Sequence, residues 1–458
     1  MVKVKITAYK HKFSFTIPTN IIKKIRVKTG DYIKIILNKG TKRIIFYSRV
    51  PSIPHSRTNL QIKRSIPKNF IKKFNVKKED LINLKIFLIK KKRVTKLIYK
   101  DKLDILAAIP EKTKTEKQIM VDVFKKRGEE WCKIWYCSGK GGKVKEIKLK
   151  RFIKIDRNLG EFFGLMQAES SKKGVCFDFT NKFLSEIKLF LNVAQKFGIH
   201  KDLWEYTIFY SPSMKPEILN NHITYLKKEI NINKIKTCKN KNLLDVIYSV
   251  RIPHRLLAIV MINMLIKLRE WASQLNKNSK IKFKEFTKGF ILKDLVGDGS
   301  VVLNNHNGLD IVISEQDKKS QELIIKILKL FDIHSLAHDI KIDVSTDFNS
   351  CLWFLENKAF LEHKKNRRKL LIYIINNYYF NCLYKRLKNI DGYSVKKFAG
   401  KHDLRYKSAQ RYLYQNIKRG FIYKEGERIY KTTEKGKKFV KLINNAKIES
   451  NKLTLNYA

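Results

Sequence analysis

Two segments of the sequence end a predicted helix in the same way, and this repeat constrains the fold most. In residues 162–177 an apolar run is closed by Glu169 and Ser170, and in residues 290–302 a second run is closed by Gly297-Asp298-Gly299. A β-rich segment follows each acid. One acid in such a place would be read as a turn cap, but two copies predict two versions of one α/β unit.

Each predicted unit continues with an amphipathic helix that ends in the same aromatic step. The steps are Phe197-Gly198-Ile199 and Phe331-Asp332-Ile333, and they lie 28 (197 − 169) and 33 (331 − 298) residues after the acids. Apolar residues recur on one face of both helices. They are Phe183, Ile187, Phe190, Leu191 and Ala194 in the first helix, and Leu323, Ile324, Ile327, Leu328 and Phe331 in the second.

If the two motif helices pack side by side, Glu169 and Asp298 meet at one end of the contact. Small residues that let helix backbones approach are present there. They are Gly164 and Ala168 in the first copy and Gly297 and Gly299 in the second. Two close carboxylates repel each other unless cations lie between them, so we expect a divalent metal with oxygen ligands, Mg²⁺ first. Two-metal phosphodiester cleavage is the reaction class that this arrangement favours.

The charge of the chain favours a polyanionic partner. It has 98 Lys and Arg against 41 Asp and Glu, a net charge of +57, spread along the whole length. Such a chain is expected to bind phosphate backbones by counterion release; a solvated, Lys-rich surface is the alternative. The six cysteines form no zinc set, and no apolar run is long enough for a membrane span. We expect reduced thiols, no membrane contact and a cytoplasmic location.

The residues around both acids resemble the double-motif LAGLIDADG homing endonucleases. FFGLMQAES at 162–170 is similar to the nine-residue motif, and FILKDLVGDGSV at 290–301 matches its common form best at the end. The resemblance implies a pseudo-two-fold core of two αββαββα units that binds a long double-stranded DNA site. It also implies that Glu169 and Asp298 bind Mg²⁺ or Mn²⁺ and catalyse cleavage.

Some positions depart from the family pattern. Lys293 stands where a packing glycine is usual, and Gln167 and Val296 replace an Asp. We expect the helix contact to shift by a turn or to be looser at Lys293, so loss of cleavage stays open. The segment SVRIPHRLL resembles a family block with an accessory basic residue, which falls on Arg251; contact with backbone phosphate is the alternative. No general base is assigned by the sequence.

The first hundred residues contain another repeat, in which FTIPTNIIKKIRV is followed 49 residues later by RSIPKNFIKKFNV. Each copy predicts a strand, a short helix opened by proline, a turn and a second strand. The repeat resembles the AbrB/SpoVT swapped-hairpin DNA-binding fold, closed here as a pseudo-dimer within one chain. An unrelated small β-rich domain is the alternative.

Residues 376–458 resemble a winged helix-turn-helix, with three short helices, a two-strand wing and a closing helix after Thr433-Glu434-Lys435-Gly436. The third helix would enter the major groove, and its predicted DNA-binding residues are Lys407, Arg411, Lys418 and Arg419. A protein-binding winged helix is the alternative.

These patterns together predict an α+β multidomain chain. The expected segments are a tandem swapped-hairpin domain at 1–100, a linker with strand elements at 101–150, an endonuclease-like core at 151–375, with units of about 151–275 and 276–375, and a winged helix at 376–458. The favoured function is a monomeric, metal-dependent, site-specific DNA endonuclease. The alternatives are a transcription regulator on an inactive core and, less favoured, an RNA maturase.

Overall fold

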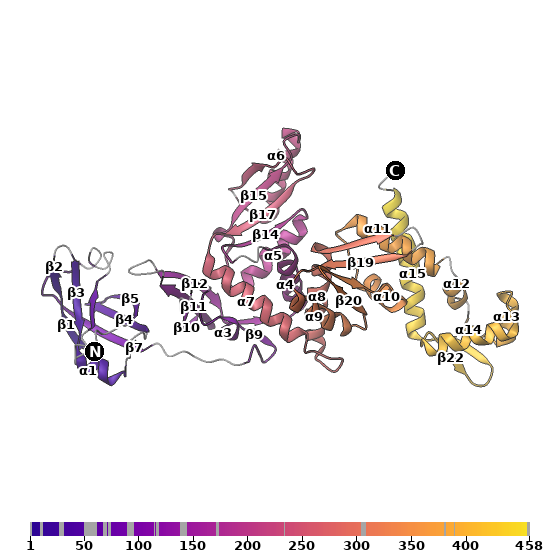
Figure 1. Ribbon diagram of the computed structural model, residues 1–458, viewed down its shortest axis with the longest axis horizontal. Coiled ribbons are helices and arrows are strands. Elements are labelled where there is room, and N and C mark those ends of the chain that lie inside the picture. Colours follow the sequence, from indigo (N-terminus) through magenta and orange to yellow (C-terminus); the bar gives the residue numbers. More distant parts are fainter. Residues whose placement is uncertain are drawn as a thin grey trace. The chain divides into compact units, whose positions relative to one another are not determined.

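The chain forms two compact units in the computed structural model (Figure 1). The structure describes residues 2–9, 12–26, 32–49, 62–66, 71, 75–88, 96–113, 115, 119–137, 144–170, 174–232, 234–303, 308–379, 382–388 and 390–455. The first unit comprises Met1–Thr95, Lys114–Phe124 and Cys132–Glu146, and the second comprises Lys96–Thr113, Lys125–Trp131 and Ile147–Ala458. The contacts thus divide the chain differently from the four expected segments, because residues 101–150 contribute to both units.

The first unit contains two small antiparallel sheets. Its described elements begin with β1 Val2–Lys5, β2 Thr7–Tyr9, β3 Lys12–Ile17, α1 Thr19–Lys24, β4 Tyr32–Lys39, β5 Lys42–Arg49, β6 Ile62–Ser65 and β7 Leu81–Leu88. One sheet has the order β1-β7-β4-β5 and the other has the order β2-β3-β6. Alternate residues of these strands, such as Phe15, Ile35 and Ile82, bury a common apolar core.

The two N-terminal repeats pair with each other through equivalent strands. Phe15 lies opposite Arg64 in the β3–β6 pair, and Ile36 lies opposite Lys85 in the β4–β7 pair. Both pairs join residues that are 49 apart (64 − 15 and 85 − 36), which is the offset of the repeat. Antiparallel strands that meet at equivalent positions are related by a two-fold rotation, so an internal pseudo-two-fold axis passes through both pairs. The second proline-opened helix, expected at 67–70, lies outside the described residues.

The segment expected as a linker has regular structure. Its elements and their neighbours are β8 Ile98–Tyr99, β9 Lys102–Asp104, α3 Ile105–Ala108, β10 Met120–Lys126, β11 Glu129–Cys137, β12 Val144–Lys150 and β13 Phe152–Lys154. Within the second unit, Arg151 donates to both Asp104 and Glu130, with N···O distances of 2.7 Å to each. This ion cluster fixes the chain just before the first motif helix.

The predicted duplication appears as two successive halves of the second unit. The first half contains α4 Arg157–Glu169, β14 Phe177–Asn181, α5 Leu184–Lys196, η1 Lys201–Leu203, β15 Glu205–Tyr210, α6 Pro216–Ile230, β16 Lys236–Lys239, β17 Ile247–Ile252 and α7 Arg255–Ala272. The second half contains α8 Ile281–Gly297, β18 Gly299–Leu303, β19 Leu309–Ser314, α9 Lys318–Lys329, β20 Ser335–His338, β21 Lys341–Val344 and α10 Phe348–Glu356.

The sheets of the two halves share three strands and differ at both edges. Their orders are β14-β17-β15-β16 and β18-β19-β21-β20, so β14, β17 and β15 correspond to β19, β21 and β20. Among the described residues, no strand stands beside β14 as β18 stands beside β19. The first half is five residues shorter between acid and aromatic step (33 − 28), and β18 is five residues long. At the other edge the first half adds α6 and β16, which pairs parallel to β15.

The chain ends in a set of short helices and a two-stranded wing. The elements are α11 Lys364–Ile374, the π-helical turn η2 Ile375–Tyr379, α12 Cys382–Lys388, α13 Val395–Lys401, α14 Tyr406–Lys418, β22 Ile422–Glu425, β23 Ile429–Thr432 and α15 Glu434–Leu455. In the described part of the chain, no helix is long and apolar enough to span a membrane.

Candidate functional site

Helices α4 and α8 pack together at backbone distance (Figure 1). A Cβ added to Gly160 would lie 1.8 Å from the carbonyl oxygen of Phe286, and one added to Gly289 would lie 2.5 Å from that of Arg157. The two glycines are 129 residues apart (289 − 160), and so are the residues they face (286 − 157). The motif acids have the same offset (298 − 169), so the contact repeats about a pseudo-two-fold axis. Neither of these glycines was among the sequence-predicted packing residues.

One turn further along, the contact is asymmetric because of Lys293. A Cβ on Gly164 would lie 2.2 Å from the carbonyl oxygen of Phe290 and 3.0 Å from Cβ of Lys293. The Lys293 ammonium leaves the helix contact and donates to Oε1 of Glu186 on α5. Glu186 is buried, and burial raises the pKa of its carboxyl group. Lys293 therefore offsets a buried charge, while the glycine contact of α8 falls one turn earlier, at Gly289.

The helices meet again at their C-terminal ends, where both acids lie. A Cβ on Gly297 would lie 2.3 Å from Cβ of Ala168 and 3.3 Å from Oε1 of Glu169. Glu169 is the last residue of α4, and Asp298 is the C-cap of α8, one residue beyond Gly297. The structure thus brings the two sequence-predicted acids to one place, each from a different half.

Gly299 does not take part in this contact, which corrects the expectation for that residue. A Cβ on Gly299 would lie 2.1 Å from the carbonyl oxygen of Leu295 in the same helix. The glycine allows the chain to turn tightly from α8 into β18, and the approach of the two helices depends on Gly297 instead.

The two acids have different surroundings. Burial raises the pKa of Glu169, and the positive charge of Lys182 partly offsets this effect. Asp298 is fixed through its backbone, since its N–H donates to the Asp294 carbonyl at 2.9 Å and its carbonyl accepts from the Ser314 N–H at 3.0 Å. The first acid is therefore placed by helix packing, and the second is also tied to the end of β19.

Lys182 and His363 lie near the acids, and the sequence did not single them out. His363 packs edge-on against Phe183, with ring centres 5.5 Å apart. Burial and the charge of Lys182 lower the pKa of His363. The two residues come from separate halves and meet only through the tertiary fold, so no local pattern signals them.

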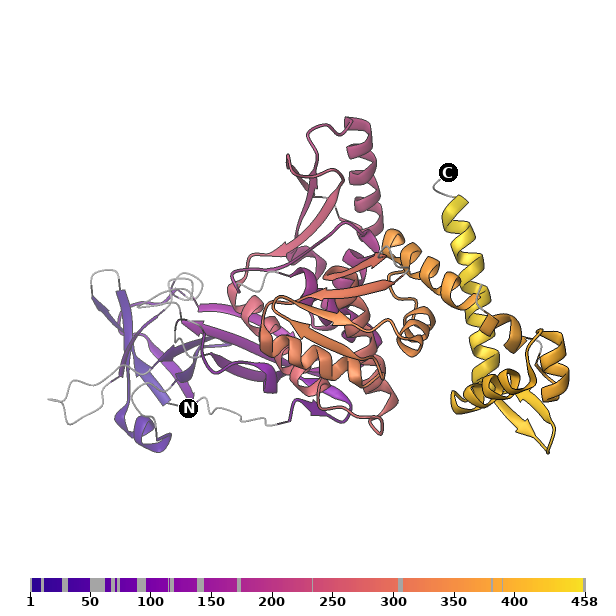
Figure 2. The same ribbon diagram turned by 45° about the vertical axis from the view of Figure 1, so that its right-hand side comes forward.

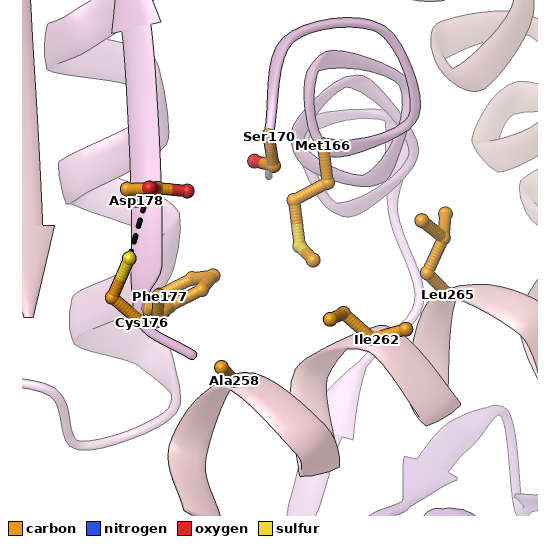
Figure 3. A pocket seen from close by; sticks show the side chains of 8 residues that line it. All are labelled: Met166, Ser170, Cys176, Phe177, Asp178, Ala258, Ile262 and Leu265. Carbon is orange, nitrogen blue, oxygen red and sulfur yellow. Dashed lines mark hydrogen bonds between the residues drawn. The ribbon is translucent and has the colours of Figure 1, made fainter. Parts of the chain in front are cut away.

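A small pocket opens beside the end of α4 (Figure 3). Its lining residues are Met166, Ser170, Cys176, Phe177, Asp178, Ala258, Ile262 and Leu265. The Cys176 thiol donates to Oδ2 of Asp178 at 3.1 Å. Asp178 lies opposite Arg251 in the β14–β17 pair, and Arg251 is exposed. The predicted accessory residue therefore lies on an exposed strand near the pocket, and its charge partly offsets the burial that raises the pKa of Cys176.

A buried polar network explains Gln167, which replaces the Asp of the family motif. Its amide nitrogen donates to Oε2 of Glu315 at 2.7 Å, and its amide oxygen accepts from Arg269 at 2.9 Å. Ser320 also donates to Glu315 at 2.7 Å and accepts from Arg269. All four residues are buried. Gln167 therefore joins the two halves through polar contacts beneath the acids.

The donor set at the helix ends suits a hard divalent cation. In the described part of the chain, no three His, Cys, Asp or Glu side chains gather closely enough to form a metal site by themselves. Mg²⁺ is commonly held by one or two carboxylates and completes its octahedron with water and phosphate oxygens. Glu169 and Asp298, brought together from two elements, match that pattern.

The four predicted DNA-binding residues are exposed on or next to α14. Lys407, Arg411, Tyr414 and Lys418 recur at intervals of four, three and four residues and therefore share one helix face. The ammonium of Lys418 lies 4.7 Å from the centre of the Tyr414 ring. Arg419 follows as the C-cap of the helix. Ala409 and Leu413 occupy the opposite face and are buried.

Comparisons with known proteins support one segment clearly. A winged helix-turn-helix family matches residues 386–450, so the C-terminal segment is a winged helix-turn-helix. Comparison with curated proteins gives no match.

Among solved structures, the chain is similar to I-DmoI in complex with DNA and Ca, with 16% identity, a TM-score of 0.24, and coverage of 44% of this chain and 88% of that one. It is also similar to mesophilic variants of the homing endonuclease I-DmoI, with 15% identity, a TM-score of 0.24 and the same coverage. We draw the function proposed below from the geometry of this chain.

Proposed function

We propose that the chain is a site-specific endonuclease for double-stranded DNA with a LAGLIDADG-type core. The observation that carries the proposal is the meeting of Glu169 and Asp298 at one end of a pseudo-two-fold helix contact. The two backbones of a DNA duplex are also related by two-fold axes, so each acid would serve one strand. The internal symmetry would let a monomer do what otherwise needs two subunits.

The residues of the chain would bind and orient the scissile phosphates. Glu169 and Asp298 would hold Mg²⁺ or Mn²⁺, which when bound neutralises charge on the phosphate and activates water. Arg251, exposed on β17, would contact a phosphate oxygen in the first half. Lys182 would keep Glu169 ionised by offsetting its burial.

The rest of the chain would supply affinity and site selection. A net charge of +57 favours binding to a phosphate backbone. The face of α14 with Lys407, Arg411 and Lys418 would enter a major groove, as recognition helices of this fold do. For the N-terminal unit we propose the AbrB-like swapped-hairpin role, which the pairing of equivalent strands across its pseudo-two-fold axis favours.

A transcription regulator on an inactive core is the second candidate. It is favoured by the winged helix together with the unequal halves, since the sheet beside β14 has no described counterpart of β18. Both candidates bind duplex DNA, and only the first cuts it.

Cleavage of DNA from the gene's own genomic surroundings separates the two. The purified chain should cut such DNA with Mg²⁺ or Mn²⁺, and Glu169→Gln or Asp298→Asn should lower the rate at least about 10³-fold, because each removes a ligand charge at the reacting phosphate. Gel-shift affinity should change little in either variant. Tight binding without cutting by the unaltered chain would establish the regulator instead.

A further inference from the structure

Helix α15 belongs to two parts of the second unit at once. A Cβ on Gly436, near its start, would lie 2.2 Å from the carbonyl oxygen of Phe421 and 2.6 Å from Cγ2 of Thr432. The glycine thus lets α15 lie directly on the wing, while other parts of the same helix pack against α10, α11 and α12. At 22 residues it is about 33 Å long. Figure 2 shows it as one continuous helix, so it joins wing and core without a flexible linker.

A forked ion pair fixes α15 to the core. Arg367 on α11 donates through Nε and Nη2 to the two carboxylate oxygens of Glu449, at 2.9 and 2.8 Å. Its Nη1 also donates to the Ala359 carbonyl at 3.1 Å. Only 3% of the Arg367 side chain is exposed. Such a two-point contact fixes both the distance and the rotation of α15 against α11.

An aromatic cluster fixes the same two parts at a second point. Phe348, at the start of α10, lies with ring centres 5.3 Å from both Phe421 and Phe439. Phe421, which precedes the wing, and Phe439, on α15, are both buried. Tyr378 packs on Phe348 at 5.0 Å. Two separate contacts of different chemistry prevent rotation about either one.

We infer that the winged helix and the second half of the core read one duplex as a rigid unit, at two sequence elements of invariant spacing. This inference rests on the proposed DNA-binding function. The face of α14 with Lys407, Arg411 and Lys418 points away from the anchored side, because Ala409 and Leu413 fill that side. The winged-helix element lies beyond the part of the site that the Asp298 half covers, since α10 and α11 follow that half.

A rigid reader is sensitive to the spacing of its elements in a way that a tethered one is not. Each inserted base pair moves the outer element by about 3.4 Å and turns it by about a tenth of a turn. Five base pairs would turn it to the far side of the duplex. Ten would restore the face but displace the element by about 34 Å, a shift comparable with the whole length of α15.

The test uses the full-length Glu169→Gln/Asp298→Asn variant, which binds without cutting. Duplexes selected from a random pool are footprinted with this protein and with a version that also carries Arg411→Ala and Lys418→Ala. The segment whose protection is lost in that version is the winged-helix element. Insertions of five and ten base pairs between the elements should each weaken binding at least about 10-fold. Equal affinity for all spacings would overturn the inference.

A loosened anchor should relax this requirement. Arg367→Lys keeps the charge but loses the fork, and the penalty for a five-base-pair insertion should fall to less than about 3-fold. Lys437→Gln is the matched control, because it breaks an exposed ion pair within α15 itself and should leave the penalty intact. Thermal melting shows whether either variant is folded, and the insertion series on the parent stands by itself. Failure to bind any duplex would overturn both proposals, whereas free spacing overturns only this one.

Discussion

The two halves of the second unit agree closely in their motif helices and poorly in their sheets. Helices α4 and α8 repeat the same backbone contacts at an offset of 129 residues. The sheets gain and lose strands at their edges over the same stretch of chain. A helix contact at backbone distance admits no change of side-chain size, whereas an edge strand can be shortened or added at the surface. The conserved part is therefore the part that positions the two acids.

Lys293 is the point at which the helix contact itself differs between halves, and its removal should have the largest effect. Lys293→Met leaves Glu186 buried without its partner, and loss of one member of a buried pair lowers the free energy of unfolding by about 3–5 kcal/mol. Urea denaturation measures this loss. The pKa of Glu186 is raised on folding, so its ionised form destabilises the fold as the pH increases, and the loss should be larger at pH 8 than at pH 5.

The matched control for that change is the double variant Lys293→Met/Glu186→Gln. It removes the uncompensated charge and should recover most of the stability. If Lys293→Met alone costs less than about 1 kcal/mol, the ion pair is not what fills this position.

Gly160→Ala and Gly289→Ala test whether the two halves are equivalent in the helix contact. The added methyl groups would meet backbone carbonyls at 1.8 and 2.5 Å, so each should lower the free energy of unfolding by about 1–3 kcal/mol, the first more than the second. Gly400→Ala is the control. It lies in α13 with nothing within 4 Å, and it should raise stability by about 0.5–1 kcal/mol.

Arg251 has no basic counterpart in the second half, which predicts unequal cutting of the two strands. In the β14–β17 pair Arg251 lies opposite Asp178, and in the β19–β21 pair the matching position is Asp343, opposite Val312. Arg251→Gln should slow cleavage of one strand about 10-fold and leave nicked plasmid, read from separately end-labelled strands. Asp343→Asn is the matched change in the other half and should leave the strand ratio unaltered.

Glu169→Gln should give the smallest effect, a gain in stability that depends on pH. Burial raises the pKa of Glu169 above its ordinary value of 4.5. The folded state therefore favours the neutral acid, and stability is lost as the pH rises through that raised value. The variant should melt about 2 °C higher than the parent at pH 8 and equally near pH 4, by differential scanning calorimetry. A lower melting temperature at pH 8 would show that the ionised acid is stabilising.

Some of this arrangement follows from local sequence, and some of it does not. The two acids at the ends of apolar helices and the small residues beside them are visible in short stretches, so the meeting of the helix ends was foreseeable. The difference of five residues between halves signalled unequal sheets, but not which strand is affected. The winged helix was also predicted, and the family match confirms it.

The buried polar partners could not be predicted in the same way. Lys293 and Glu186 are 107 residues apart, and Gln167 and Glu315 are 148 residues apart. Charged and amide side chains are usually solvent-exposed, so the bland expectation for each was the surface. Their pairing depends on how the two halves lie against each other, which no short pattern encodes.

The N-terminal pseudo-two-fold axis has a thermodynamic consequence. Where two separate chains build such an arrangement, folding is coupled to association, and the melting temperature rises with protein concentration. Here equivalent strands such as β4 and β7 belong to one chain, so their pairing is a unimolecular event that dilution does not weaken. The fused copies are also free to differ across the axis, as Phe15 opposite Arg64 already shows.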